Sequence, residues 1–160
     1  MKIQNKPKKR ILLDLDVVTV GLWDKGERGD AARVYMEKIR RGDIILCTSY
    51  HLLELVNQWK HERLKDQISE FFELWAARIY STKEIFENAK AKNIDYSQVI
   101  NAPIKTGVKE EDTILVLITS IFQLDALITF NRVHLKNNQE MINQILTRNN
   151  MEVIKIEFPN

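Results

Sequence analysis

EEDTILVLITSIFQLDALITFN, residues 110–131, is the stretch that indicates the fold most clearly. Asp112 opens a long apolar helix, the strand 126–129 follows that helix, and Asn131 comes just after the strand. The same order of strand and helix recurs through the rest of the chain. Strands that alternate with helices predict an α/β fold, in which a mostly parallel sheet is flanked by helices on both faces.

Apolar spacing, capping residues and chain breakers predict the other elements. The first strand begins at the apolar run from Ile11 and is predicted to end near Val17–Val20. We expect further strands at 44–47, 79–80 and 151–158. Helices are predicted at 30–41, from a cap at Thr48 or Ser49 to about residue 60, at 64–77, from a cap at Ser81 or Thr82 to about residue 92, and at 138–147. Residues 21–29 read as a helical turn and loop, and 93–107 as a long connection.

Four polar side chains fall where such a chain reaches one edge of its sheet. Asp14 lies near the end of the first strand, and Glu54 in the first turns of the helix after the second strand. Asp112 opens its helix and Asn131 follows the next strand. Ligands of parallel α/β sheets bind outside the carboxyl ends of the strands. Three carboxylates and an amide there need a positive partner, and oxygen ligands favour Mg²⁺ or Mn²⁺.

Each of these residues also has a simpler interpretation. A buried acid is costly, so Asp14 inside a leucine-rich strand favours a functional role, but an exposed glutamate fits the helical position of Glu54 equally well. Asp112 is also stabilised by the helix dipole, and asparagine suits the turn at Asn131. Asp16 would point to the opposite face if the strand continued, or would help to order the turn after it.

Composition is that of one globular domain spanning residues 1–160. The chain has 160 residues, 44% hydrophobic and 29% charged, which suffices for a core and argues against disorder. No apolar run approaches the roughly 20 residues that span a bilayer, and no signal segment is apparent at its start. The single cysteine, Cys47, lies in a predicted buried strand, which favours a core residue over a catalytic thiol. We therefore expect a cytoplasmic protein.

The net charge of +2 does not itself predict nucleic-acid binding, but the basic residues are clustered. A basic N-terminal arm is expected over residues 1–10. Phosphate-binding proteins use such clusters for electrostatic attraction, whereas ordinary solvated faces with acidic neighbours explain each one equally well. The remaining clusters are Arg40-Arg41, Lys60-His61-Arg63-Lys65 and Arg132-His134-Lys136, and from them Lys60, Arg132 and Lys136 are the candidate RNA-binding residues.

The segments ILLDLDV, SYHLLEL, EEDTILVLITS and LDALITFNRVHL resemble, in that order, the motifs of PIN domains, especially the VapC-like branch. Asp14, Glu54, Asp112 and Asn131 match the family's acidic positions, and Thr129 matches its threonine. The resemblance covers about residues 11–135 and implies a PIN-like (Rossmann-like) fold. It departs from the family in having Asn131 where many members carry an aspartate, a bulky helix after Asp112, a long 93–107 connection and the basic arm.

The resemblance implies a metal-dependent endoribonuclease, a hydrolase that leaves 5′-phosphate and 3′-hydroxyl ends. Asp14 and Asp112 would bind Mg²⁺ or Mn²⁺ directly, and Glu54 would bind through water or act as a base. Asn131 would orient water or coordinate through its carbonyl, supported by Thr129. Relatives pair as homodimers and bind an antitoxin, which makes a toxin–antitoxin role an expectation.

Two other interpretations remain open. Residues 14–18, DLDVV, also resemble the first motif of haloacid-dehalogenase-type phosphatases, in which Asp14 would be the nucleophile. That family needs an acidic pair after a later strand, whereas Asp112 precedes a helix and Asn131 is an amide. The other alternative is a non-catalytic PIN-like module that binds RNA or protein. Metal binding separates it from an enzyme, because only a competent site is stabilised by Mn²⁺.

Overall fold

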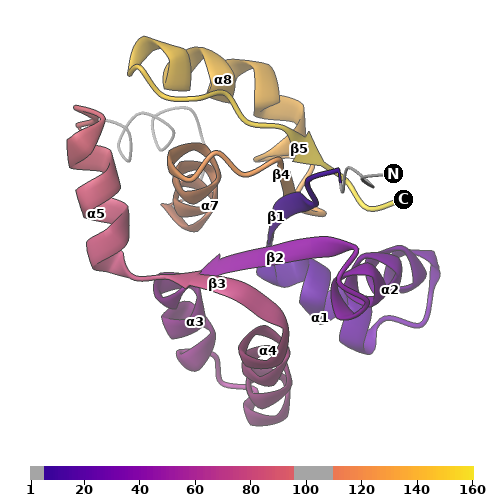
Figure 1. Cartoon of the computed structure of the whole chain (residues 1–160). Coiled ribbons are helices and arrows are strands. Elements are labelled where there is room, and N and C mark those ends of the chain that lie inside the picture. The colour runs from indigo at the N-terminus through magenta and orange to yellow at the C-terminus, as the bar shows by residue number, and fades with distance from the viewer. Residues whose placement is uncertain (1–5, 96–109) are drawn as a thin grey trace, which may run out of the picture.

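In the computed structural model, which describes residues 6–95 and 110–160, the described strands form one five-stranded sheet (Figure 1). Their order is β3-β2-β1-β4-β5, and all neighbouring pairs are parallel. The first strand of the chain therefore lies at the centre, which confirms the predicted α/β class with a parallel sheet. The strands are β1 (Lys9–Leu13), β2 (Ile44–Ser49), β3 (Ala76–Tyr80), β4 (Ala126–Ile128) and β5 (Ile156–Glu157).

Helices cover both faces of the sheet, as the alternation of side chains along β1 requires. Ile11 and Leu13 pack into one core with α1, α2 and α4, and Leu12 packs into a second core with α5, α7 and α8 (Figure 1). The described helices are α1 (Leu15–Trp23), α2 (Glu27–Arg40), α3 (Tyr50–Asn57), α4 (Glu62–Trp75), α5 (Thr82–Ala91), α7 (Glu110–Ile121), α8 (Gln139–Arg148) and the short 3₁₀ helix η1 (Lys136–Asn138).

The first strand is shorter than predicted, because the chain turns into a helix at Asp14. Asp14 is the N-cap residue of α1, and Val17 and Val18 are fully buried on that helix. The prediction that the strand reaches Val17–Val20 is therefore wrong. Gly21 allows α1 to approach α2 closely, since a Cβ there would overlap with the sulfur of Met36. Tertiary packing against α2 thus overrides the strand propensity of the valines.

Two of the predicted helix caps are confirmed. Ser49 accepts the backbone N–H of Leu52 at the start of α3. Ser81 and Glu84 form a reciprocal capping box at the start of α5. The buried Cys47 lies in the core on β2, in agreement with its interpretation as a core residue. Most of the connection predicted at 93–107 lies outside the described residues.

The last strand is much shorter than the predicted 151–158. Its approach is held by side chains of α8, because Asn143 Oδ1 accepts the N–H of Ile154 and Gln139 Oε1 accepts the N–H of Ile156. These bonds satisfy N–H groups on the outer edge of the sheet, where β5 has no neighbouring strand among the described residues. The prediction of a strand over the whole segment is wrong, because β5 covers only Ile156–Glu157.

The basic N-terminal arm is also shorter than predicted, because Lys9 and Arg10 belong to β1. Lys9 pairs with Glu157 at 2.7 Å, and the Arg10 guanidinium donates to the hydroxyl of Tyr80 at 2.8 Å. These two cations therefore join parts of the sheet rather than extending into solvent, and residues 1–5 lie outside the described range.

Among the described helices, none has the length and apolar character that crossing a bilayer requires.

Candidate active site at the carboxyl edge of the sheet

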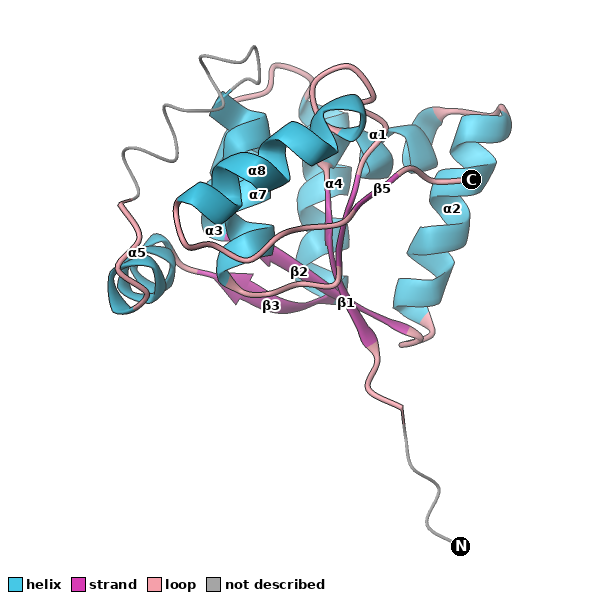
Figure 2. Cartoon of the chain, turned by 90° about the horizontal axis from the view of Figure 1, so that it is seen from above, coloured by secondary structure: helices cyan, strands magenta, loops and turns pink. Residues whose placement is uncertain are grey.

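The site lies where β1 and β4 end side by side. The register of these strands pairs Leu13 with Ile128, so Asp14 and Thr129 follow their strands at the same level. The N–H of Asp14 donates to the carbonyl of Ile128 at 2.9 Å, which fixes the backbone at this point. Figure 2 shows that α1 begins at this end of β1, opposite the end from which the N-terminal segment leaves. This is the carboxyl edge, where the sequence predicts the functional residues.

A chain of hydrogen bonds joins Asp14 to Asp112 through the loop after β4. Thr129 Oγ1 donates to Asp14 Oδ2 at 2.8 Å and accepts the N–H of Asn131 at 2.9 Å. Asn131 Nδ2 donates to Asp112 Oδ2 at 3.3 Å, and its Oδ1 accepts the N–H of His134 at 3.0 Å. Four of the five residues singled out from the sequence are thus connected, although they come from separate elements.

Asp16 also belongs to this group, a role that the sequence did not resolve. It lies in the first turn of α1 and accepts the N–H of Phe130, with the shorter contact at 3.2 Å. The start of α1 brings Asp16 toward the loop after β4. The expectation that Asp16 would face away in a continued strand is wrong, because residues two apart in a strand lie on the same face. The signal in the sequence was a second acid two residues after Asp14. It points to a shared site only once the start of α1 at Leu15 is known.

Burial raises the pKa of both acids that flank Leu15. Asp14 has its pKa raised to about 6 by burial and by the charge of Asp112, against the opposing effect of the Thr129 hydroxyl. Asp16 has its pKa raised to about 7 by burial and by the charge of Asp14, against the opposing N–H of Phe130. Adjacent carboxylates of this kind are costly when ionised, and a bound cation would remove much of that cost. Such perturbed acids are typical of functional sites.

Glu54 stands apart from this network. It lies on α3 with an exposed side chain. Within residues 6–95 and 110–160, no three His, Cys, Asp or Glu side chains are grouped so that they could hold one metal ion. Asp14, Glu54 and Asp112 are therefore not brought together as a three-acid cluster. The connected pair, Asp14 and Asp112, suits an ion that keeps most of its water, as Mg²⁺ does with one or two carboxylates.

The candidate RNA-binding residues differ in their surroundings. Arg132 is exposed and its guanidinium lies 4.1 Å from the centre of the Phe158 ring. Lys136 donates its amine to the carbonyl of Ile156 at 2.7 Å, so this charge supports the end of β5. Lys60 is exposed in the turn before α4, where Lys65 pairs with Glu62. Arg132 lies next to the hydrogen-bonded site because it follows Asn131, and Lys136 contacts the same residue through its backbone N–H, which donates to the carbonyl of Asn131 at 3.1 Å.

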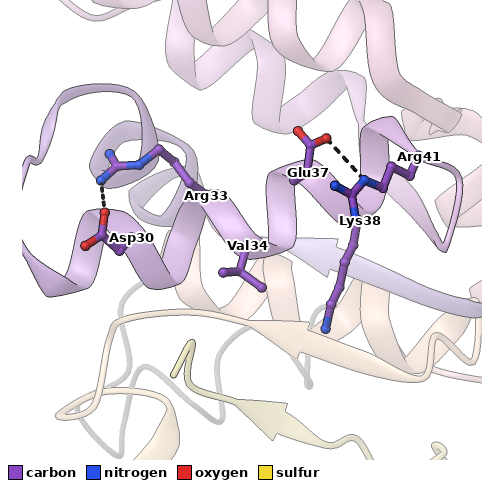
Figure 3. A pocket seen from close by; sticks show the side chains of 6 residues that line it. All are labelled: Asp30, Arg33, Val34, Glu37, Lys38 and Arg41. Carbon is purple, nitrogen blue, oxygen red and sulfur yellow. Dashed lines mark hydrogen bonds and ion pairs between the residues drawn. The ribbon is translucent and has the colours of Figure 1, made fainter.

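The basic cluster Arg40-Arg41 is engaged with an acid of its own helix. Glu37 contacts Arg40 at 3.7 Å and Arg41 at 3.3 Å. Arg41 borders a surface hollow of about 400 Å³ (Figure 3). In this hollow Arg33 pairs with Asp30 and Arg41 pairs with Glu37. This face of α2 carries mixed charge, which favours a solvated surface over a phosphate-binding one. The residues that line the hollow are Asp30, Arg33, Val34, Glu37, Lys38 and Arg41.

The chain has a PIN-like fold, as the sequence predicts. Structural comparison finds a chain of VapBC2 from Rickettsia felis, solved bound to a DNA fragment from their promoter, with a TM-score of 0.56 and 9% sequence identity. The match covers 94% of this chain and 99% of that chain. At this identity the likeness shows the fold. No protein-family model matches the sequence, and neither does any curated protein.

Proposed function

We propose that this protein is a metal-dependent endoribonuclease that hydrolyses RNA phosphodiester bonds, as a VapC-like toxin of a toxin–antitoxin pair. The observation that carries the proposal is the continuous set of hydrogen bonds Asp14–Thr129–Asn131–Asp112 at the carboxyl edge of the sheet. The PIN-like fold, shared with a chain of VapBC2, supports the same interpretation. Buried acids whose pKa values are raised, on a fold of this type, favour a metal site over a structural role.

The donor set fits Mg²⁺ or Mn²⁺, which prefer carboxylate, carbonyl and water oxygens. Asp14 and Asp112 would hold the ion, and Glu54, which lies outside the network, would act through water or as a base. When bound, the ion supplies stabilisation of the negative charge that develops on the phosphate oxygens during hydrolysis.

The surrounding residues position these carboxylates. The Thr129 hydroxyl fixes one oxygen of Asp14, and the amide of Asn131 fixes one oxygen of Asp112. Asn131 is itself oriented, because its carbonyl oxygen accepts the N–H of His134. An amide cannot serve as a base at neutral pH, so Asn131 orients ligands rather than transferring a proton. Asp16 lies beside Asp14, and its carboxylate, when ionised, increases the attraction for a cation.

The phosphatase alternative is disfavoured by the same geometry. It needs two acids after a later strand, and β4 is followed by Thr129, Phe130 and Asn131.

An antitoxin and a second copy of the chain are the proposed protein partners. The likeness to a chain of VapBC2 supports the antitoxin, and co-purification from cells together with the mass of the purified species would test both.

Cleavage of a mixed pool of structured and single-stranded RNA tests the enzyme. The wild-type protein is assayed with Mn²⁺ and with EDTA beside two variants, Asp14→Asn and Asp43→Asn. Asp43 is a matched control, because it is an exposed aspartate that precedes β2 at the opposite edge of the sheet. We expect cleavage that needs both Mn²⁺ and Asp14, leaves 5′-phosphate ends and survives the Asp43 substitution. Cleavage that persists in Asp14→Asn would refute the assignment.

The stability readout separates an inactive assay from a missing site. Mn²⁺ should raise the melting temperature of the wild-type protein if the site binds metal, even when the RNA pool lacks the true substrate. An absence of both cleavage and stabilisation would favour the non-catalytic binding module.

A further inference from the structure

Next to the hydrogen-bonded site lies a pocket that the proposed chemistry does not use. It has a volume of about 490 Å³ and adjoins the acids in two ways. Asn131 belongs to both the pocket and the site, and the N–H of Phe130 donates to Asp16. The pocket is thus continuous with the carboxyl edge. Its lining comes from α2, from the loop after β4 and from the segment after β5, namely Arg28, Phe130, Asn131, Arg132, Val133 and Phe158.

Two arginines stand over two phenylalanines in this pocket. The guanidinium carbon of Arg28 lies 4.6 Å from the centre of the Phe130 ring, and that of Arg132 lies 4.1 Å from the centre of the Phe158 ring. The two rings meet edge to face, with centres 5.1 Å apart. Cation–π attraction holds each guanidinium plane in place while its N–H groups stay free to bind an anion. The aromatic pair therefore presents two arginines in a fixed arrangement.

Within the described residues, neither Arg28 nor Arg132 forms a side-chain ion pair. In the part of the chain that the structure describes, the arginines that form ion pairs are Arg33, Arg40, Arg41 and Arg78. Arg28 and Arg132 are both exposed. Arg28 is close enough to Asp16 to stabilise its carboxylate electrostatically. Positive charge thus borders the acids at the place where a polyanionic strand would have to approach them.

We propose that the pocket formed by Arg28, Phe130, Arg132 and Phe158 binds an unpaired nucleotide and its phosphate next to the scissile bond of a single-stranded RNA. This rests on the proposed nuclease function, which it extends to the substrate. A guanidinium group can donate two N–H hydrogen bonds to the oxygens of one phosphate, and its plane can stack on an exposed base. Bases of a duplex are already stacked on their neighbours, so the pocket selects single strands or loops.

Binding is measured without cleavage, so that the result does not depend on the chemistry. An unstructured RNA oligonucleotide and a duplex of the same length are titrated in EDTA against the full-length Asp14→Asn protein, at several salt concentrations. Arg28→Ala and Arg132→Ala, each added to that background, should weaken single-strand binding about tenfold, as loss of a charge-assisted hydrogen bond does. Each should also reduce the slope of log affinity against log salt by about 0.7.

Three further variants separate a local contact from general charge or misfolding. Arg41→Ala removes the same charge from the far end of α2, where Arg41 pairs with Glu37, and should leave affinity within about twofold because exposed pairs contribute little. Arg132→Lys keeps the charge and should retain the salt slope while losing part of the affinity. Phe158→Leu keeps most of the apolar volume without an aromatic face and should weaken binding while the protein still unfolds cooperatively, with a melting temperature lowered by its partial loss of core packing.

The outcomes distinguish the pocket from the nuclease. If Arg28→Ala and Arg132→Ala bind the single strand no more weakly than Arg41→Ala does, the pocket is not a nucleotide site and a protein segment becomes its occupant. Equal affinity for the duplex would overturn the preference for single strands. If the arginine variants specifically lose binding while the wild-type protein neither cleaves RNA nor is stabilised by Mn²⁺, the pocket is upheld and the proposed function is refuted.

Discussion

Replacing Asp14 with asparagine should stabilise the metal-free protein at neutral and alkaline pH, although it removes a candidate metal ligand. Burial and the charge of Asp112 raise the pKa of Asp14 from 3.8 to about 6 in the folded protein. The ionised side chain is therefore unfavourable in the native state compared with the unfolded chain. Asparagine has nearly the same shape, and its carbonyl oxygen can still accept the Thr129 hydroxyl, so the substitution removes the charge and keeps the hydrogen bond.

The pH dependence has a definite sign. Because the folded pKa is raised, the native protein binds more protons than the unfolded chain between about pH 4 and pH 6, and the free energy of unfolding falls as pH rises through this interval. The contribution of protonated Asp14 to the free energy of unfolding is fully present below about pH 4 and is lost above about pH 6. A rise in pKa from 3.8 to about 6 corresponds to roughly 3 kcal/mol. Relaxation around the site lowers the expected gain at pH 8 to about 1–3 kcal/mol.

Urea denaturation in EDTA at about pH 4 and about pH 8 measures this difference. Asp14→Asn should exceed the wild-type free energy of unfolding at the higher pH and approach it at the lower one. Asp43→Asn is the matched control, since it makes the same substitution at an exposed aspartate outside the site. A variant that is no more stable than the wild-type protein at the higher pH would refute the account of a buried, electrostatically strained carboxylate.

Three further predictions concern the site and its support. Mn²⁺ should raise the melting temperature of the wild-type protein at neutral pH and have little effect on Asp14→Asn, because binding to the native state adds stability by linkage; an equal rise in both proteins would place the ion elsewhere. Thr129→Val should lower the free energy of unfolding by about 1–3 kcal/mol, since it leaves the N–H of Asn131 without its acceptor, and should abolish cleavage, whereas Thr129→Ser should restore both. Ser81→Ala should cost about 1 kcal/mol through loss of the capping box with Glu84, with unchanged RNA cleavage; a loss of cleavage in the folded variant would contradict a purely structural role.

Several predictions that depend on local sequence were confirmed by the structure. Alternating strands and helices gave the parallel α/β class, and the serines at positions 49 and 81 cap the helices that follow them. Asp14 and Asp112 could be placed near one edge because parallel strands end, and the intervening helices begin, at the same side of a sheet. Periodicity and capping are short-range properties, so they can be read without knowledge of distant neighbours.

Long-range pairing decided the features that the sequence left open. The valines after Asp16 suit a strand by their own propensity, but packing against α2 holds them in a helix and carries Asp16 into the site. The joining of Asp14 to Asp112 through Thr129 and Asn131 depends on β4 lying beside β1.

The pocket likewise required the segment after β5 to reach the loop after β4, since Phe130 and Phe158 are far apart in the chain but their rings meet. The sequence by itself determined the alternation of strands and helices and the acids at their ends, but not the helix α1 or the short β5. Only the tertiary structure decided which of those acids and cations come together, because their contacts are set by the packing of distant segments and carry no local pattern.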